Sequence, residues 1–266
     1  MSVALVNAAS FSSVCNLIFC FSPVNPTNLQ IIFITGSSSG VGLVTAKAFF
    51  EKGWNVTATM CKPEGDIAID AATSTFGKID VVWNNAGYGQ YGLLEMLPRE
   101  KCRRQFDMNV FGVMDVTHAI ISHLYLNKSG CTISVSTSTG LFELFEGSMY
   151  SSSKFALKGF THILPYRGIS ETNLLQTAMA MVLAEPTLTP VYGEYIEKAM
   201  KKYQSMDVSG SVSAEEVANV IINAATDGTD KLRYLVRWDE HGFVKAHYES
   251  KSDEKSITYM RSFCNS

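Results

Sequence analysis

The chain has 266 residues, of which 46% are hydrophobic and 18% are charged. This length and apolar content suffice for a single domain with a sizeable buried core. The formal net charge is -3, and the lysines and arginines are scattered along the chain. We therefore do not expect nucleic acid as a partner, because the chain has no cluster of basic residues to bind a phosphate backbone.

The six cysteines and five histidines form no recognisable metal-binding pattern. The sequence contains no Cys-x-x-Cys pair, and no cysteine lies near a histidine at metal-ligand spacing. We therefore expect no metal ion, and we expect reduced thiols in a cytoplasmic protein.

The first 28 residues are unusual because no charged side chain precedes Lys47. The apolar stretch 14–21 is too short to span a bilayer, and a secretory signal needs a basic leading region. A targeting segment is one interpretation, but we expect residues 1–28 to be an extension without regular structure. Residues 29–266 are expected to form one domain without a membrane helix.

The next elements predict a βαβ unit. Residues 30–35 are a short apolar run that predicts a strand buried on both faces, and residues 41–52 have a helical pattern that ends at Gly53. Residues 54–60 predict a second strand. Units of this kind indicate a parallel sheet.

Between this first strand and helix lies a glycine turn with the sequence TGSSSGVG. Turns of this composition also occur without a ligand, but free N–H groups at a helix N-terminus favour a pyrophosphate. Glycines permit the tight turn and the close approach of a dinucleotide. The candidate binding residues are Gly36, Ser38, Ser39, Gly40, Val41 and Gly42.

The end of the second strand bears on the choice of dinucleotide. A carboxylate there would bind the ribose hydroxyls of NAD, but residues 59–62 read Thr-Met-Cys-Lys. Lys62 is able to meet a 2′-phosphate. The sequence therefore favours NADP over NAD.

Eighteen residues separate Met60 from Ile79, which leaves room for one helix at 67–76. A strand at 79–84 then leads into an Asn-Asn-Ala-Gly turn, and a long helix is predicted at 98–124. Core packing and dimer contact both explain the apolar stripe of that helix, formed by Phe106, Val110, Val113, Thr117, Ile120 and Leu124.

A strand at 131–136 precedes a helix predicted at 150–166, which carries Tyr150 and Lys154 one turn apart. A phenol titrates near pH 10 in isolation, and a neighbouring ammonium stabilises its ionised form. The pair is therefore suited to proton exchange. Hydroxyls able to hold a substrate carbonyl are offered by Ser136, Thr137 and Ser138, and Asn109 on the facing helix is able to bind a water.

Three further elements are predicted downstream. An amphipathic helix is expected at 191–203, and a capping box at 213–216 opens a helix that runs to Ala225. A last strand is expected at 232–237.

In combination, the glycine turn, the Asn-Asn-Ala-Gly turn and the Tyr-x-x-x-Lys pair resemble the short-chain dehydrogenase/reductase family in its single-domain type. The resemblance implies a Rossmann-like, doubly wound parallel sheet with helices on both faces. It also implies hydride transfer between NADP(H) and an alcohol or carbonyl substrate, in a homodimer or homotetramer.

The resemblance also implies site residues. The catalytic tetrad would be Asn109, Thr137, Tyr150 and Lys154, of which Asn109, Tyr150 and Lys154 also border the cofactor. The turn residues Asn85, Ala86 and Gly87 would line the cofactor site. The family serine lies thirteen residues before the tyrosine, where this chain has Thr137, and Ser136 is the alternative.

Two departures from the family pattern are expected. The family has a helix, a strand and a second helix at the place of residues 61–78, where this chain has room for one helix only. The family also has a strand and a Pro-Gly turn after the catalytic helix, and this chain is expected to lack both. The sheet is therefore predicted to be shortened by one or two strands. A catalytically silent nucleotide-binding or interaction protein is the alternative function.

The candidate substrate is a small apolar molecule. The methionines and leucines at 174, 175, 179 and 181 suggest this, although core packing explains them equally well.

Overall fold

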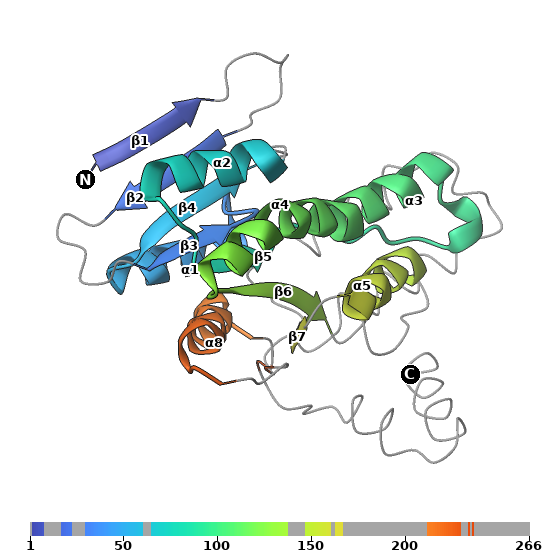
Figure 1. The fold of residues 1–266 in the computed structure, drawn as a ribbon. Helices are drawn as coiled ribbons and strands as arrows, with labels where there is room; N and C mark the ends of the chain where they lie inside the picture. Colours follow the sequence, from blue (N-terminus) through green and yellow to red (C-terminus); the bar gives the residue numbers. More distant parts are fainter. Residues whose placement is uncertain are drawn as a thin grey trace.

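A computed structural model describes residues 2–7, 17–22, 30–60, 65–137, 147–160, 163–166, 212–229, 234 and 236. These residues contain a seven-stranded sheet of order β1-β2-β4-β3-β5-β6-β7 (Figure 1). The five strands from β4 to β7 are parallel: β4 Asn55–Met60, β3 Ile31–Ile34, β5 Val81–Asn84, β6 Cys131–Thr137 and β7 Ile163–Tyr166.

Helices cover both faces of this sheet. Along β3, Ile32 and Ile34 share a cluster with residues of α1 (Gly40–Glu51) and α8 (Ala214–Thr226). Ile31 and Phe33 point the other way, toward α2 (Gly65–Phe76) and α4 (Gly112–Asn127). The predicted α/β fold with a doubly wound parallel sheet is confirmed, because successive strand residues are buried on opposite faces.

The N-terminal extension contributes two strands. β1 (Ser2–Asn7) pairs antiparallel with β2 (Leu17–Ser22), and β2 pairs antiparallel with β4 from Leu17–Met60 to Phe21–Val56. The expectation that residues 1–28 lack regular structure is therefore wrong for these two segments. The physical reason is that β4 would otherwise have an edge of unpaired N–H and C=O groups, which the apolar β2 segment pairs.

One helix, α2, is assigned between β4 and β5 in the described part of the chain, as the spacing of residues 60–79 predicts. In the sheet, β3 lies between β4 and β5, and β2 pairs with the other edge of β4.

The long helix predicted at 98–124 has three parts. It consists of α3 (Arg99–Phe106), a π-helical turn (Asp107–Phe111) and α4, after a short 3₁₀ turn at Leu94–Met96. Val110, Val113 and Ile120 of the predicted apolar stripe are at most 6% exposed. Core packing therefore explains these three residues, and dimer contact through the same helix stays a prediction.

The helix that carries Tyr150 and Lys154, α5, spans Ser148–Phe160 and is shorter than the predicted helix at 150–166. Residues Ile163–Tyr166 form β7, which pairs parallel with β6, so the predicted loss of a strand after this helix is wrong. Pro165 explains the difference, because proline disrupts a helix interior but is tolerated in a strand at the sheet edge.

The predicted capping box is confirmed at the start of α8. The Ser213 hydroxyl accepts a hydrogen bond from the Glu216 N–H at 3.1 Å, and the Glu216 carboxylate accepts one from the Ser213 N–H at 2.8 Å. The helix predicted at 191–203 lies outside the described residues, as does the strand predicted at 232–237 apart from residues 234 and 236. No helix among the described residues has the length and apolar character needed to cross a membrane.

Candidate active site

The glycine turn is shaped by two close backbone approaches. Gly36 has a left-handed φ of 70°, and a Cβ there would lie 2.8 Å from the Cα of Ala86. A Cβ on Gly42 would overlap the carbonyl oxygen of Gly36 and lie 2.6 Å from Nδ2 of Asn85. Both positions therefore require glycine for the turn to pack against the Asn-Asn-Ala-Gly segment.

α1 begins at the end of this turn. Its N-cap residue, Ser39, has an extended backbone, and its side chain makes no capping hydrogen bond. Ser38 and Ser39 are exposed, Gly40 is partly exposed, and Val41 is buried in the core. A helix N-terminus at the carboxyl edge of a parallel sheet is suited to binding a pyrophosphate.

A hydrogen-bond network joins the glycine turn to the turn after β5. The Thr35 hydroxyl accepts hydrogen bonds from the N–H groups of Asn85 and Ala86, both at 3.0 Å. The Asn85 side-chain amide donates to the carbonyls of Thr35 and Gly36 at 3.0 and 3.1 Å. Asn85 therefore holds the two turns together. The sequence predicted Asn85 as a residue of the cofactor site but did not predict this structural role.

Asn109 lies in the π-helical turn and is 1% exposed. Its Oδ1 accepts a hydrogen bond from the Tyr88 N–H at 3.1 Å, and its Nδ2 donates to the Tyr88 carbonyl at 2.9 Å and to Ser153 Oγ at 3.0 Å. Ser153 in turn donates to the carbonyl of Tyr150 at 2.7 Å. Asn109 thus connects the loop after β5 with α5.

Tyr150 and Lys154 are both buried, with 4% and 7% of their surface exposed. The Lys154 Nζ lies 5.9 Å from the centroid of the Tyr150 ring and donates a hydrogen bond to the Val135 carbonyl at 3.0 Å. Burial lowers the pKa of Lys154 from 10.5 to about 8. At neutral pH this side chain is still mainly an ammonium, so a cation lies beside the phenol.

Gly87 brings the two groups of site residues together. A Cβ at this position would lie 3.1 Å from Asn109 Oδ1 and 3.7 Å from Lys154 Nζ. The predicted cofactor turn and the predicted tetrad residues Asn109, Tyr150 and Lys154 therefore meet at one edge of the sheet.

Thr137 is the last residue of β6 and is 6% exposed, while Ser136 is 2% exposed. Strand alternation directs these two side chains to opposite faces, so they are distinct candidates for holding a carbonyl. Ser138, the third predicted hydroxyl, and Lys62, the predicted 2′-phosphate ligand, lie outside the described residues.

Gln105, which is fully buried on α3, is a site residue that was not predicted from the sequence. Its Nε2 donates a hydrogen bond to the Tyr88 carbonyl at 2.7 Å, and its Oε1 accepts one from the Gln90 N–H. The available signal was its spacing, because Gln105 precedes Asn109 by four residues and such residues share a helix face.

Comparison with known proteins agrees with this geometry. The family model for short chain dehydrogenase matches residues 63–171. The uncharacterized oxidoreductase YusZ of Bacillus subtilis is 30% identical, with 79% of this chain and 89% of YusZ covered. The chain belongs to the short-chain dehydrogenase family.

Other members of the family extend the comparison. The 3-ketodihydrosphingosine reductase of Bacteroides thetaiotaomicron is 33% identical over 51% of this chain and 57% of that protein. A short-chain dehydrogenase/reductase from Burkholderia phymatum, solved in complex with NAD, shares the fold with a TM-score of 0.68 and 18% identity, and covers 85% of this chain and 95% of that one. The predicted short-chain dehydrogenase type of oxidoreductase is confirmed.

The residues of this short-chain dehydrogenase fit a nicotinamide dinucleotide. Two glycine positions leave no room for side chains, and the Ser39 side chain does not cap the adjoining helix. Gly87 keeps the space beside the Lys154 ammonium clear of a side chain. These features suit a ligand with a pyrophosphate at one end and a reactive ring at the other.

Proposed function

We propose that this short-chain dehydrogenase transfers a hydride between NADP(H) and an alcohol or carbonyl group of a small apolar substrate. The observation that carries the proposal is the buried Tyr150–Lys154 pair, placed beside Gly87 and Asn109 at the carboxyl edge of the sheet. A bound nicotinamide dinucleotide supplies or accepts the hydride. Residues 29–266 would form the single catalytic domain.

Tyr150 is the proposed acid or base. It gives a proton to the substrate oxygen in reduction and takes one in oxidation. The Lys154 ammonium, 5.9 Å from the phenol ring centroid, favours the ionised phenol and so lowers the barrier to proton exchange. Lys154 would also bind the cofactor ribose, and the position of its Nζ next to Gly87 supports this role.

Thr137 is the proposed group that orients the substrate oxygen, and Asn109 supports the proton relay to Lys154. Asn109 keeps its position through bonds to Tyr88 and Ser153. Because Ser136 and Thr137 face opposite sides of β6, Thr137→Ala should lower kcat and Ser136→Ala should not. The reverse result would assign the role to Ser136.

The preference for NADP is proposed from the end of β4. That strand ends in Thr59 and Met60 without a carboxylate, and Lys62 follows two residues later. Fluorescence titration with NADPH and NADH tests the preference, and Lys62→Ala should weaken NADPH binding alone. Equal affinity for both dinucleotides in the unaltered protein would contradict it.

The substrate class is proposed from the names of relatives. One relative is a 3-ketodihydrosphingosine reductase and another, in Bos taurus, is retinol dehydrogenase 8. These names support a ketone or alcohol attached to an apolar group.

Turnover by Tyr150→Phe is the direct test of the function. The unaltered protein should reduce members of a broad carbonyl panel with NADPH, and Tyr150→Phe should abolish turnover while it still binds NADPH. An unaltered protein that folds and binds NADPH but reduces no member of the panel would favour the catalytically silent alternative.

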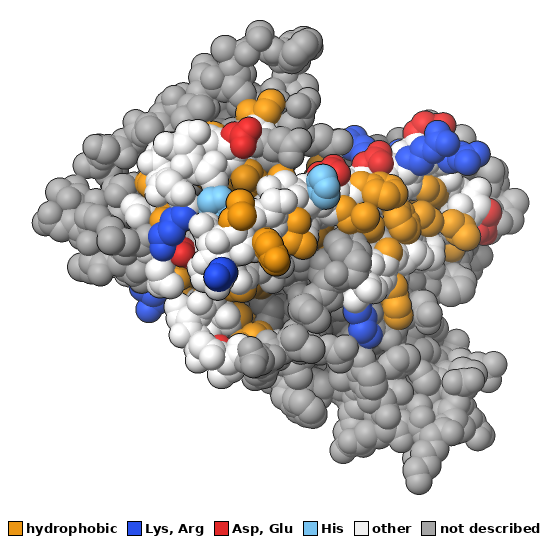
Figure 2. All heavy atoms as spheres, viewed as in Figure 1, with side chains coloured by type: hydrophobic (Ala, Val, Ile, Leu, Met, Phe, Trp, Pro, Cys, Tyr) orange, Lys and Arg blue, Asp and Glu red, His pale blue; other side chains and the backbone are white. Residues whose placement is uncertain are grey.

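A homodimer is a second proposal, supported by an exposed apolar face along α4 and the last residue of the π-helical turn before it. Phe111, Met114, Ile121 and Tyr125 recur at helical spacing and are between 44% and 82% exposed. Figure 2 shows hydrophobic side chains gathered along this helix. Ile121→Asp should shift the protein toward the monomer in sedimentation velocity, whereas Thr132→Asp, at an exposed site of β6, should not.

We also propose a cytoplasmic location. The three cysteines within the described residues, Cys20, Cys102 and Cys131, are free thiols, which suits a reducing compartment.

A further inference from the structure

A tyrosine outside the family motifs lies against the proposed catalytic tyrosine. The ring centroids of Tyr91 and Tyr150 are 5.7 Å apart, and the ring planes are inclined by 37°. This separation is within the range of attractive aromatic pairs. Tyr150 belongs to α5, whereas Tyr91 belongs to the loop after β5, so the pair joins two separate elements of the site.

The loop that carries Tyr91 is held on both sides of Gly89. Before it, Tyr88 exchanges two backbone hydrogen bonds with the Asn109 side chain and accepts a third from Gln105. After it, the Gln90 N–H donates to Gln105. Because Gln105 and Asn109 are buried, moving this loop would leave buried polar groups without partners.

Gly89 provides the space that the Tyr91 ring occupies. A Cβ on Gly89 would lie 2.6 Å from Cε2 and 3.3 Å from Cδ2 of Tyr91. Gly89 has no left-handed φ, so its backbone does not require glycine. An alanine there would therefore act on the position of the Tyr91 ring, because this ring is the nearest movable group.

Hydrogen bonds hold the backbone at Tyr150 and the neighbouring lysine, and the contact with Tyr91 acts on the phenol ring itself. Ser153 binds the backbone carbonyl of Tyr150, and the neighbouring Lys154 is held by Val135, but neither bond restrains the phenol ring. Proton transfer needs the hydroxyl to stay within hydrogen-bond reach of the substrate oxygen. A ring packed beside the phenol limits its rotation.

We propose that Tyr91 is a positioning residue that holds the phenol ring of Tyr150 in the orientation for proton transfer. Its catalytic consequence rests on the proposed oxidoreductase function. The contact itself does not, so it can be measured in the protein without substrate.

The first experiment is a double-mutant cycle of urea unfolding on the full chain with Tyr91→Leu and Tyr150→Leu. The unfolding equilibrium constant should show a coupling of about two- to twelvefold between the two positions, the range for aromatic pairs. Tyr91→Phe, which keeps the ring, should retain most of this coupling. A coupling below about 1.5-fold would overturn the proposal.

The second experiment measures carbonyl reduction with NADPH. Tyr91→Leu should lower kcat about tenfold or more, because small misplacements of a reacting group are costly, while its affinity for NADPH should stay within about twofold. Gly89→Ala should lower kcat in the same way, and adding it to Tyr91→Leu should cause no further loss. Gly159→Ala, where a Cβ meets no atom within 4 Å, is the matched control and should keep full activity.

The outcomes separate this proposal from the function on which it rests. An active wild type whose kcat is unchanged by Tyr91→Leu would overturn the role of Tyr91 and leave the proposed function intact. A wild type without turnover would refute the proposed function, and the unfolding cycle alone would then decide whether Tyr91 holds the Tyr150 ring.

Discussion

The side-chain amide of Asn109 donates a hydrogen bond to the Ser153 hydroxyl at 3.0 Å. The Ser153 hydroxyl in turn donates a hydrogen bond to the backbone carbonyl of Tyr150, three residues earlier on α5. The π-helical turn that carries Asn109 is an uncommon conformation, and such turns recur at functional sites. Here it places one amide between the loop after β5 and the helix with the proposed catalytic pair.

Ser153→Ala tests this link. The variant should lose about 1–3 kcal/mol of free energy of unfolding, because one donor of the buried Asn109 amide loses its partner. Urea unfolding at neutral pH measures the change. Ser152→Ala, at the exposed neighbouring position, is the matched control and should change stability by less than about 0.5 kcal/mol. Equal losses in the two variants would contradict the link.

The low pKa of Lys154 predicts a pH dependence of stability. Between about 8 in the native state and 10.5 in the unfolded chain, the unfolded chain binds more protons, so the free energy of unfolding rises with pH in this window. Below about pH 8 both states are protonated, and the full cost of burying the ammonium is present.

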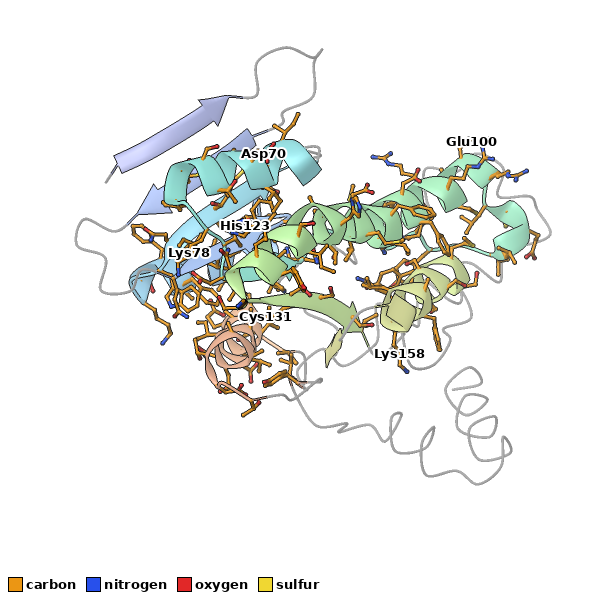
Figure 3. All side chains as sticks on the ribbon, in the orientation of Figure 1. Asp70, Lys78, Glu100, His123, Cys131 and Lys158 are labelled. Atoms are coloured by element: carbon orange, nitrogen blue, oxygen red, sulfur yellow. The ribbon has the colours of Figure 1, made fainter. Side chains whose placement is uncertain are left out.

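Comparison with Lys154→Met isolates this effect. Relative to that variant, the unaltered protein should gain about 2–3 kcal/mol in free energy of unfolding between about pH 7 and about pH 10. Lys158→Met, one turn further along α5 (Figure 3), controls for the loss of a lysine from the same helix. A difference between wild type and Lys154→Met that does not vary with pH would contradict a lowered pKa.

Gly36→Ala should lower the affinity for NADPH in addition to lowering the free energy of unfolding. Its left-handed φ of 70° alone should cost about 1–2 kcal/mol, and the 2.8 Å approach to Ala86 adds a displacement of the turn. We expect a loss of NADPH affinity on the order of tenfold or more.

Gly228→Ala is the matched control for the cost of placing an alanine in a left-handed backbone conformation. Gly228 has a φ of 64°, and a Cβ there meets no atom within 4 Å. It should show the loss of stability without the loss of affinity. Fluorescence titration and urea unfolding of both variants separate the two effects, and an equal loss of affinity would disprove the packing argument.

His123→Ala should destabilise the protein although no chemistry is assigned to this residue. His123, labelled in Figure 3, accepts a hydrogen bond at Nε2 from the Ile79 N–H at 3.1 Å, and Ile79 is 1% exposed. Removing the acceptor leaves a buried N–H unpaired, at a cost of about 1–3 kcal/mol. His118→Ala, exposed on the same helix, should be nearly neutral in thermal unfolding. Equal effects would show that the His123 bond contributes nothing.

The central sheet could be predicted because its signals are local. The apolar runs at β3 and β4, the glycines between them and the capping box of α8 each depend on neighbouring residues, and the structure has these elements within one or two residues of the prediction. The strand β7 could not be placed in the same way, because a four-residue apolar run after a helix also fits a longer helix. Pairing with β6 decided between the two.

The sequence by itself determined which residues we propose to carry the chemistry. Tyr150 and Lys154 lie one turn apart on any helix, and the glycines fix where a backbone can approach a ligand. Only the tertiary structure decided what holds these residues in place. The N-terminal strand beside β4, the Gln105 and Asn109 bonds to the loop after β5, and the ring of Tyr91 against Tyr150 join segments far apart in the chain. Contacts of this kind depend on the summed packing of the whole sheet, and no local pattern encodes them.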